Sequence, residues 1–202
     1  MNSPPTVRRW IKRACWAVAA VLAAFIGWFA YFQRFYVHQH CIVQTGFAFR
    51  AYEEDHQGRL PFDTNGFGDA LMLLVKGGYL GDVQNGWRFV TGVGDDGSLF
   101  KAALASGGHV PEEKCSRVYV QGLGQMNDFN IAVLFDRYSS HGGDHFRRPW
   151  GPLVREVSML DGSMQIVKKK NWDGFSSQQI ELLVQNGIPR ATAQHYYALT
   201  KR

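Results

Sequence analysis

An uncharged apolar segment near the N-terminus limits what this chain can fold into more than any other feature. The 19 residues from Ala14 to Phe32 include no charged side chain. With the flanking positions up to Arg13 and Arg34, a helix rising about 1.5 Å per residue reaches about 30 Å, the thickness of a bilayer's hydrocarbon core. The sequence therefore predicts a membrane-spanning helix.

Cations gather on one side of this segment. Arg8, Arg9, Lys12 and Arg13 precede it, and no acidic residue occurs before Val37. Positive charge next to a membrane-spanning segment keeps that end of the segment in the cytoplasm. We therefore predict a single-pass protein of the inner (cytoplasmic) membrane, with its N-terminus in the cytoplasm and the bulk of the chain periplasmic. Its expected parts are a cytoplasmic tail at 1–13, a transmembrane helix at 14–36 and one extracytoplasmic domain at 37–202.

Two other interpretations of the apolar segment are open. A cleaved signal peptide also has a basic start, but its apolar region has 7–15 residues and ends in small residues. Here the apolar run continues into Trp28-Phe29-Ala30-Tyr31-Phe32. A buried core helix is the other alternative, and the flanking cations disfavour it.

The net charge excludes one class of partner. The chain has 22 Lys and Arg against 17 Asp and Glu, and five of the cations precede Val37. The remainder is balanced, so no basic surplus is left for a nucleic-acid backbone. The basic clusters beyond the membrane segment, Arg147-Arg148 and Lys168-Lys169-Lys170, suit either solvent, anionic lipid headgroups or an acidic partner.

The rest of the chain predicts an α+β domain. Helical apolar spacing continues from Cys41 toward Gln57, which extends the membrane helix into a stem helix with one buried stripe. A two-residue Asp161-Gly162 turn predicts a hairpin over 154–167, with Val157, Met159, Met164 and Ile166 pointing to the core. Further predicted elements are helices at 68–75, 98–105, 176–186 (with a Ser176–Gln179 capping box) and 189–199, and strands at 87–90, 118–120 and 131–135.

Two of these motifs resemble a known family. The stem Cys41 to Pro61, ending in Gly-Arg-Leu-Pro, and the hairpin Val157-Ser-Met-Leu-Asp-Gly-Ser-Met164 are similar to type IV pilin-like and type II secretion pseudopilin-like proteins of planctomycetes and verrucomicrobia. The resemblance implies a long N-terminal helix packed on a small sheet and no catalytic residues. The prepilin cleavage motif of that family is missing, because the corresponding stretch Arg13 to Ala17 holds neither Gly nor Glu.

One loop concentrates possible metal ligands. His141, Asp144 and His145 fall within five residues of glycine-rich sequence, and imidazole and carboxylate donors suit zinc or copper. A plain polar turn explains the same residues. The metal interpretation supports an alternative function, a membrane-tethered module that binds a metal or small ligand in the periplasm.

The cysteines allow a single bridge outside the membrane. Cys41 and Cys115 both lie beyond the apolar segment, in a compartment where disulfides persist. We consider them a disulfide candidate, with two separate thiols as the alternative.

No catalytic signature accompanies these features. Cys115 and the histidines form neither a nucleophile elbow nor a Cys-His signature. We expect a non-catalytic, structural or interaction protein of the cell envelope, with no cofactor. Its expected partners are the lipid bilayer and other envelope proteins or copies of itself.

Overall fold

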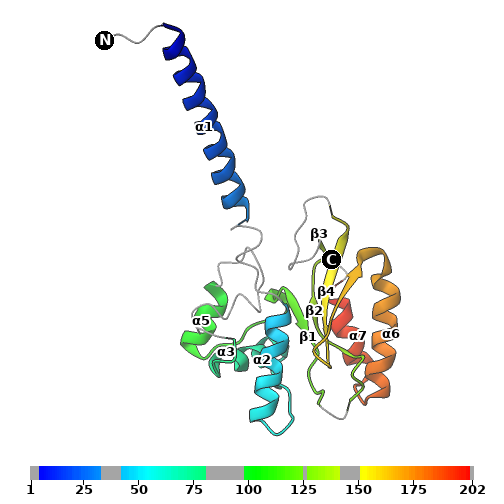
Figure 1. Ribbon diagram of the computed structural model, residues 1–202. Coiled ribbons are helices and arrows are strands. Elements are labelled where there is room, and N and C mark those ends of the chain that lie inside the picture. Colours follow the sequence, from blue (N-terminus) through cyan, green and yellow to red (C-terminus); the bar gives the residue numbers. More distant parts are fainter. Residues whose placement is uncertain (1–4, 33–41, 81–97, 125–126, 142–150, 201–202) are drawn as a thin grey trace. The chain divides into compact units, whose positions relative to one another are not determined.

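The computed structural model describes residues 5–32, 42–80, 98–124, 127–141 and 151–200, which fall into two compact units, Met1–His38 and Gln39–Arg202. The predicted strand at 87–90 lies outside the described residues. The elements, labelled in Figure 1, are α1 (Pro5–Phe32), α2 (Ile42–Asp55), α3 (Phe67–Lys76), α5 (Ser98–Ser106), η2 (Glu112–Lys114), β1 (Arg117–Tyr119), β2 (Ala132–Asp136), β3 (Ser140–His141), β4 (Leu153–Met159), β5 (Met164–Lys168), η3 (Lys169–Asn171), α6 (Trp172–Gln185) and α7 (Arg190–Ala198).

The first unit contains the apolar helix. Helix α1 begins at Pro5, a residue favoured in a first helical turn because its missing N–H would have no helical partner. Its segment Arg9–Ala30 has a mean hydropathy of 1.7, and none of it is buried. The segment is long and apolar enough to span a membrane. The predicted continuation of this helix into the stem falls on residues 33–41, outside the described residues.

The second unit is built on a small antiparallel sheet. Strand β4 lies at its centre, paired with β2 and β3 on one edge and with β5 on the other, and β1 extends the sheet beyond β2. The predicted strands at 118–120 and 131–135 are confirmed as β1 and β2, each within a residue of the expected bounds. The α+β class is therefore confirmed, with helices in both halves of the chain.

The hairpin forms, but with a longer turn than predicted. Met159 N–H donates to Ser163 O at 2.8 Å, which leaves three residues in the loop. Gly162 has a φ of 82°, but Asp161 lacks the positive φ that a two-residue Asp-Gly turn requires of both residues, since Gln57 is the one described non-glycine residue with positive φ. A three-residue loop with a left-handed glycine is the next commonest hairpin connection after the two-residue one.

The longer loop changes the pairing register. Met164 pairs with Ser158 rather than with Met159. A shift of one residue turns a strand's side chains to the other face. The prediction that Ile166 points to the core is wrong, because this side chain is 48% exposed, whereas Met164 is partly buried and packs against the core.

Helices cover both faces of the sheet. Figure 1 shows α2 on one side and α6 with α7 on the other. On the α2 side, the Phe49 ring stacks on Tyr119 of β1 at a centroid distance of 4.8 Å. On the opposite side, Phe135 of β2 stacks on Tyr197 of α7 at 4.7 Å. Both faces are consequently buried core.

Helix α6 starts earlier than the capping-box pattern predicts. It begins at Trp172, and Ser176 donates its hydroxyl to Asp173 O instead of capping the helix. Gln179 Oε1 accepts from Ala132 N–H at 2.8 Å, and its Nε2 donates to Asn130 O at 3.0 Å. The glutamine thus joins α6 to β2, because its side-chain amide bonds the backbone of Ala132 and Asn130 instead of capping α6.

Replacing Phe135 with alanine should cost about 3–5 kcal/mol of unfolding free energy, since its ring is fully buried between β2 and α7. Urea denaturation of the full chain in detergent micelles measures this loss. The matched variant Phe129→Ala removes a ring that is 59% exposed, and should change stability by no more than about 0.5 kcal/mol. Equal losses in the two variants would contradict the described core.

Candidate functional site

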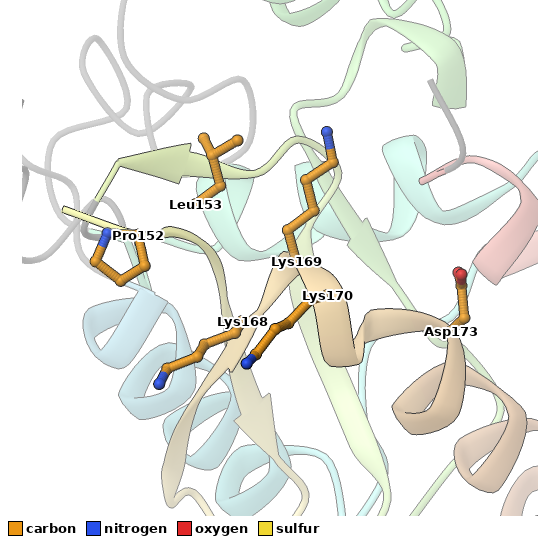
Figure 2. A pocket seen from close by; sticks show the side chains of 6 residues that line it. All are labelled: Pro152, Leu153, Lys168, Lys169, Lys170 and Asp173. Carbon is orange, nitrogen blue, oxygen red and sulfur yellow. The ribbon is translucent and has the colours of Figure 1, made fainter. Parts of the chain in front are cut away.

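A pocket lined by lysines lies where β4 begins and β5 ends. Its volume is about 640 Å³. Figure 2 shows Lys168 and Lys170 extending to one side of the view, and Lys169 extending to the other. The residues of this lysine pocket are Pro152, Leu153, Lys168, Lys169, Lys170 and Asp173. The described lining therefore carries three ammonium groups and one carboxylate around an open surface.

The local structure explains why three consecutive lysines share this surface. Lys168 is the last residue of β5 and pairs with Val154 of β4. The chain then makes the single turn η3, Lys169–Asn171, before α6 begins. A turn of this kind does not alternate its side chains between a core face and a solvent face as a strand does. All three lysines are consequently exposed.

Buried contacts fix the chain beneath the lysine pocket. Trp172, the first residue of α6, is 4% exposed and donates from Nε1 to Thr200 Oγ1 at 2.8 Å. The Arg155 guanidinium carbon lies 4.5 Å from the centroid of the Trp172 ring, and its Nη2 donates to Thr200 O at 2.7 Å. Burial lowers the pKa of Arg155, and the carboxylate of Asp173 acts in the opposite direction. The turn that carries the lysines is therefore held to the core by Trp172, the residue that follows it.

A second group of charged residues is buried beneath α2. Arg117, Asp136 and Glu156 are at most 5% exposed. Arg117 Nη1 donates to Thr45 Oγ1 at 3.2 Å, and its Nε lies 3.8 Å from Asp136 Oδ1. Asp136 Oδ2 accepts from Glu156 N–H at 2.9 Å. These contacts bind β1, β2, β4 and the start of α2 into one body.

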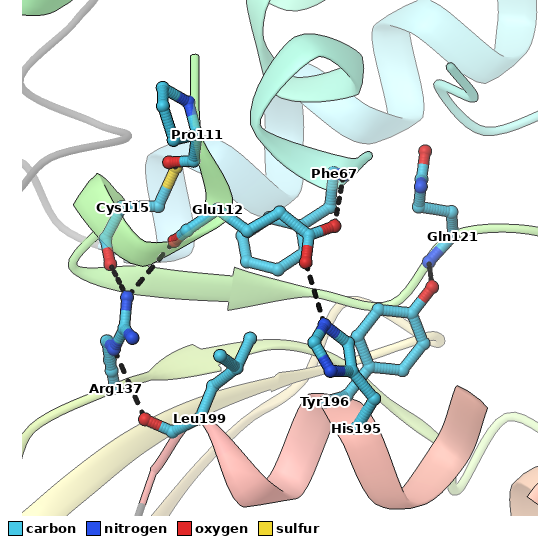
Figure 3. A network of polar contacts seen from close by, with 9 residues as sticks. All are labelled: Phe67, Pro111, Glu112, Cys115, Gln121, Arg137, His195, Tyr196 and Leu199. Carbon is cyan, nitrogen blue, oxygen red and sulfur yellow. Dashed lines mark hydrogen bonds and ion pairs between the residues drawn. The ribbon is translucent and has the colours of Figure 1, made fainter. Parts of the chain in front are cut away.

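Glu112 connects three elements on the other side of the domain, as Figure 3 shows. Its Oε1 accepts from Phe67 N–H at 2.9 Å, in the first turn of α3, where a negative charge is favoured. Its Oε2 lies 2.9 Å from His195 Nε2 on α7. Adjacent acidic residues in a turn are usually solvated, so nothing in the local sequence singles out Glu112 for this role.

Arg137 holds the ends of the same region together. Its Nη1 donates to the carbonyl oxygens of Glu112 at 3.0 Å and Cys115 at 3.2 Å. Its Nε donates to Leu199 O at 3.2 Å, near the end of α7 (Figure 3). Because these partners of Arg137 are main-chain carbonyls, the arrangement joins η2 and Cys115, which follows it, to the end of α7.

The structure places one of the three predicted metal ligands. His141 lies in β3, is exposed, and has its Nδ1 2.7 Å from Gly151 O. Asp144 and His145 lie outside the described residues. Within the parts of the chain that the structure describes, no group of three or more His, Cys, Asp or Glu could hold a metal. The site at His141, Asp144 and His145 stays a prediction.

Cys115 is buried, and its thiol donates to Pro111 O at 3.8 Å. Burial, aided by the nearby charge of Glu112, raises the pKa of the thiol from 9.0 to about 12. Cys41 lies outside the described residues, so the disulfide between Cys41 and Cys115 stays a prediction.

Comparison with known proteins adds no relative. No protein-family model, curated protein or solved structure matches the chain.

Replacing Glu112 with alanine should lower the unfolding free energy by about 1–2 kcal/mol, because it leaves the first turn of α3 without its carboxylate partner. Glu113→Ala is the matched control, since this neighbour is exposed and should change stability by no more than about 0.5 kcal/mol. Urea denaturation compares the two. A loss no larger for Glu112→Ala than for Glu113→Ala would contradict the role of Glu112.

The Cys115 thiol should resist alkylation in the folded protein. A pKa raised from 9.0 to about 12 makes the thiolate about a thousandfold rarer at pH 8. Mass spectrometry after iodoacetamide treatment should find Cys115 unmodified before denaturation and modified after it, without reductant. Rapid labelling of the folded protein would contradict its burial, and labelling that requires reductant would favour the bridge to Cys41.

Proposed function

We propose that this chain is a single-pass protein of the inner membrane, with its N-terminus in the cytoplasm and a pilin-like domain outside. The domain acts as a structural or interaction component of the cell envelope and not as an enzyme. Its role is positional: α1 holds the domain at the membrane, and the domain presents a surface to other envelope components.

The apolar surface of α1 carries this proposal. Trp16 is 76% exposed, Val21 68% and Ile26 64%, and the other described residues of the span are also exposed. Water disfavours such a continuous apolar surface, whereas a bilayer core accommodates it. A helix also satisfies its own backbone hydrogen bonds, which the hydrocarbon interior requires.

The second unit supports a structural role in a different way. Its polar groups are engaged in joining its own elements: Glu112 connects α3 with α7, Arg137 connects η2 with the end of α7, and Arg117 connects β1 with α2. Helix α2 packs on the antiparallel sheet of this unit.

The anchor and its orientation can be tested together in native membranes. We expect the full chain to resist alkaline carbonate extraction, and its C-terminal domain to be digested by protease added to spheroplasts but not to inverted vesicles. Replacing Arg8, Arg9, Lys12 and Arg13 with glutamine should yield mixed orientations, because the positive charge that retains the N-terminus is removed.

The matched control replaces Lys76 and Lys101 with glutamine, two cations outside the N-terminal region, and should leave the orientation unchanged. Extraction of the chain by carbonate would overturn the anchor. Digestion from the cytoplasmic face alone would overturn the orientation.

A further inference from the structure

The lysine pocket lies at the end of the domain from which α2 starts. Arg50, in the second half of α2, donates to Asp161 O at the hairpin tip. Thr45, one turn before it, bonds Arg117 in the first position of β1. The first residues of α2 therefore lie away from the hairpin tip, toward the start of β4. Val154 is near the start of β4, and its partner is Lys168. We call this end of the second unit the entry end.

The chain itself limits how far the entry end can be from the bilayer. Nine residues, 33–41, separate the last residue of α1 from the first residue of α2. Even a fully extended connection of this length spans no more than about 35 Å. The entry end is therefore the part of the second unit that the chain connects directly to α1.

The charges of the lysine pocket are available to an outside ligand. Among the described residues, Lys168, Lys169 and Lys170 take part in no ion pair. Among the described residues that line the pocket, Asp173 is the one carboxylate, so this part of the lining has a cationic excess. Pro152 and Leu153 add an apolar margin beside the ammonium groups.

We propose that Lys168, Lys169 and Lys170 bind the phosphate groups of anionic phospholipids in the membrane that holds α1. The inference rests on the proposed anchor. Ammonium groups near an anionic surface attract it over about a Debye length, and this exposed stretch carries three of them in succession. The open shape of the pocket suits an array of headgroups, since an enclosed phosphate site uses converging backbone N–H groups.

Selective lysine acetylation of the full chain in lipid nanodiscs tests this contact. One set of discs contains phosphatidylcholine alone, and the other also contains about 30% phosphatidylglycerol. We expect acetylation at Lys168, Lys169 and Lys170, measured by mass spectrometry, to slow about threefold or more in the anionic discs, and to recover in about 0.5 M NaCl. Lys76 is the internal control, because it ends α3, close to Tyr79, which bonds Asp55 at the far end of α2.

Two variants complete the test. In Lys168→Gln/Lys170→Gln, the protection of Lys169 should fall to the phosphatidylcholine level, whereas Lys76→Gln should leave it unchanged. Equal acetylation in both discs would overturn the lipid contact while the anchor stands, because a chain that remains in the disc is still anchored. Protection that appears in the phosphatidylcholine discs on adding inorganic phosphate, at constant ionic strength, would overturn the lipid as the ligand and favour a soluble phosphate. A chain that does not enter the discs would overturn the anchor itself.

Discussion

The burial of β4 on both faces and both edges is the constraint on which the second unit depends. Its neighbours are β2, β3 and β5, and helices cover its two faces. Arg155, Glu156 and Ser158 are nevertheless part of this strand, each at most 4% exposed. Polar groups at such depth are costly unless they find partners inside the protein. Two residues of this strand have such partners: the Arg155 guanidinium donates to Thr200 O, and the Glu156 backbone N–H donates to the Asp136 carboxylate.

Local sequence predicts much of this fold where local chemistry decides it. The uncharged run before Arg34 predicts α1, and apolar clusters between glycines predict α3 and α5. The Asp161-Gly162 pair predicts the position of the hairpin but not its register. Two- and three-residue loops use similar residues, and they differ by one position in pairing. That single position places Met164 opposite Ser158 and Ile166 opposite Glu156.

The candidate sites were harder to predict because their partners are distant in sequence. Gln179 looks like part of a helix cap, yet it bonds Ala132, 47 residues away. Glu112 looks like a solvated acid, yet it bonds Phe67 at a separation of 45 residues. The lysine run is visible in the sequence as charge alone. Its place at the entry end follows from the pairing of β4 with β5, which joins Lys168 to Val154.

The position of β5 has a consequence for molecules that share a membrane. In the described sheet β5 is an edge strand, paired only with β4, and it is five residues long. An exposed edge can recruit a strand from another copy, and confinement to a bilayer raises the frequency of such encounters. The short edge leads directly into Lys169 and Lys170, so two copies paired there in parallel and in register would bring like charges together. Continuous intermolecular sheets of that kind would consequently be disfavoured.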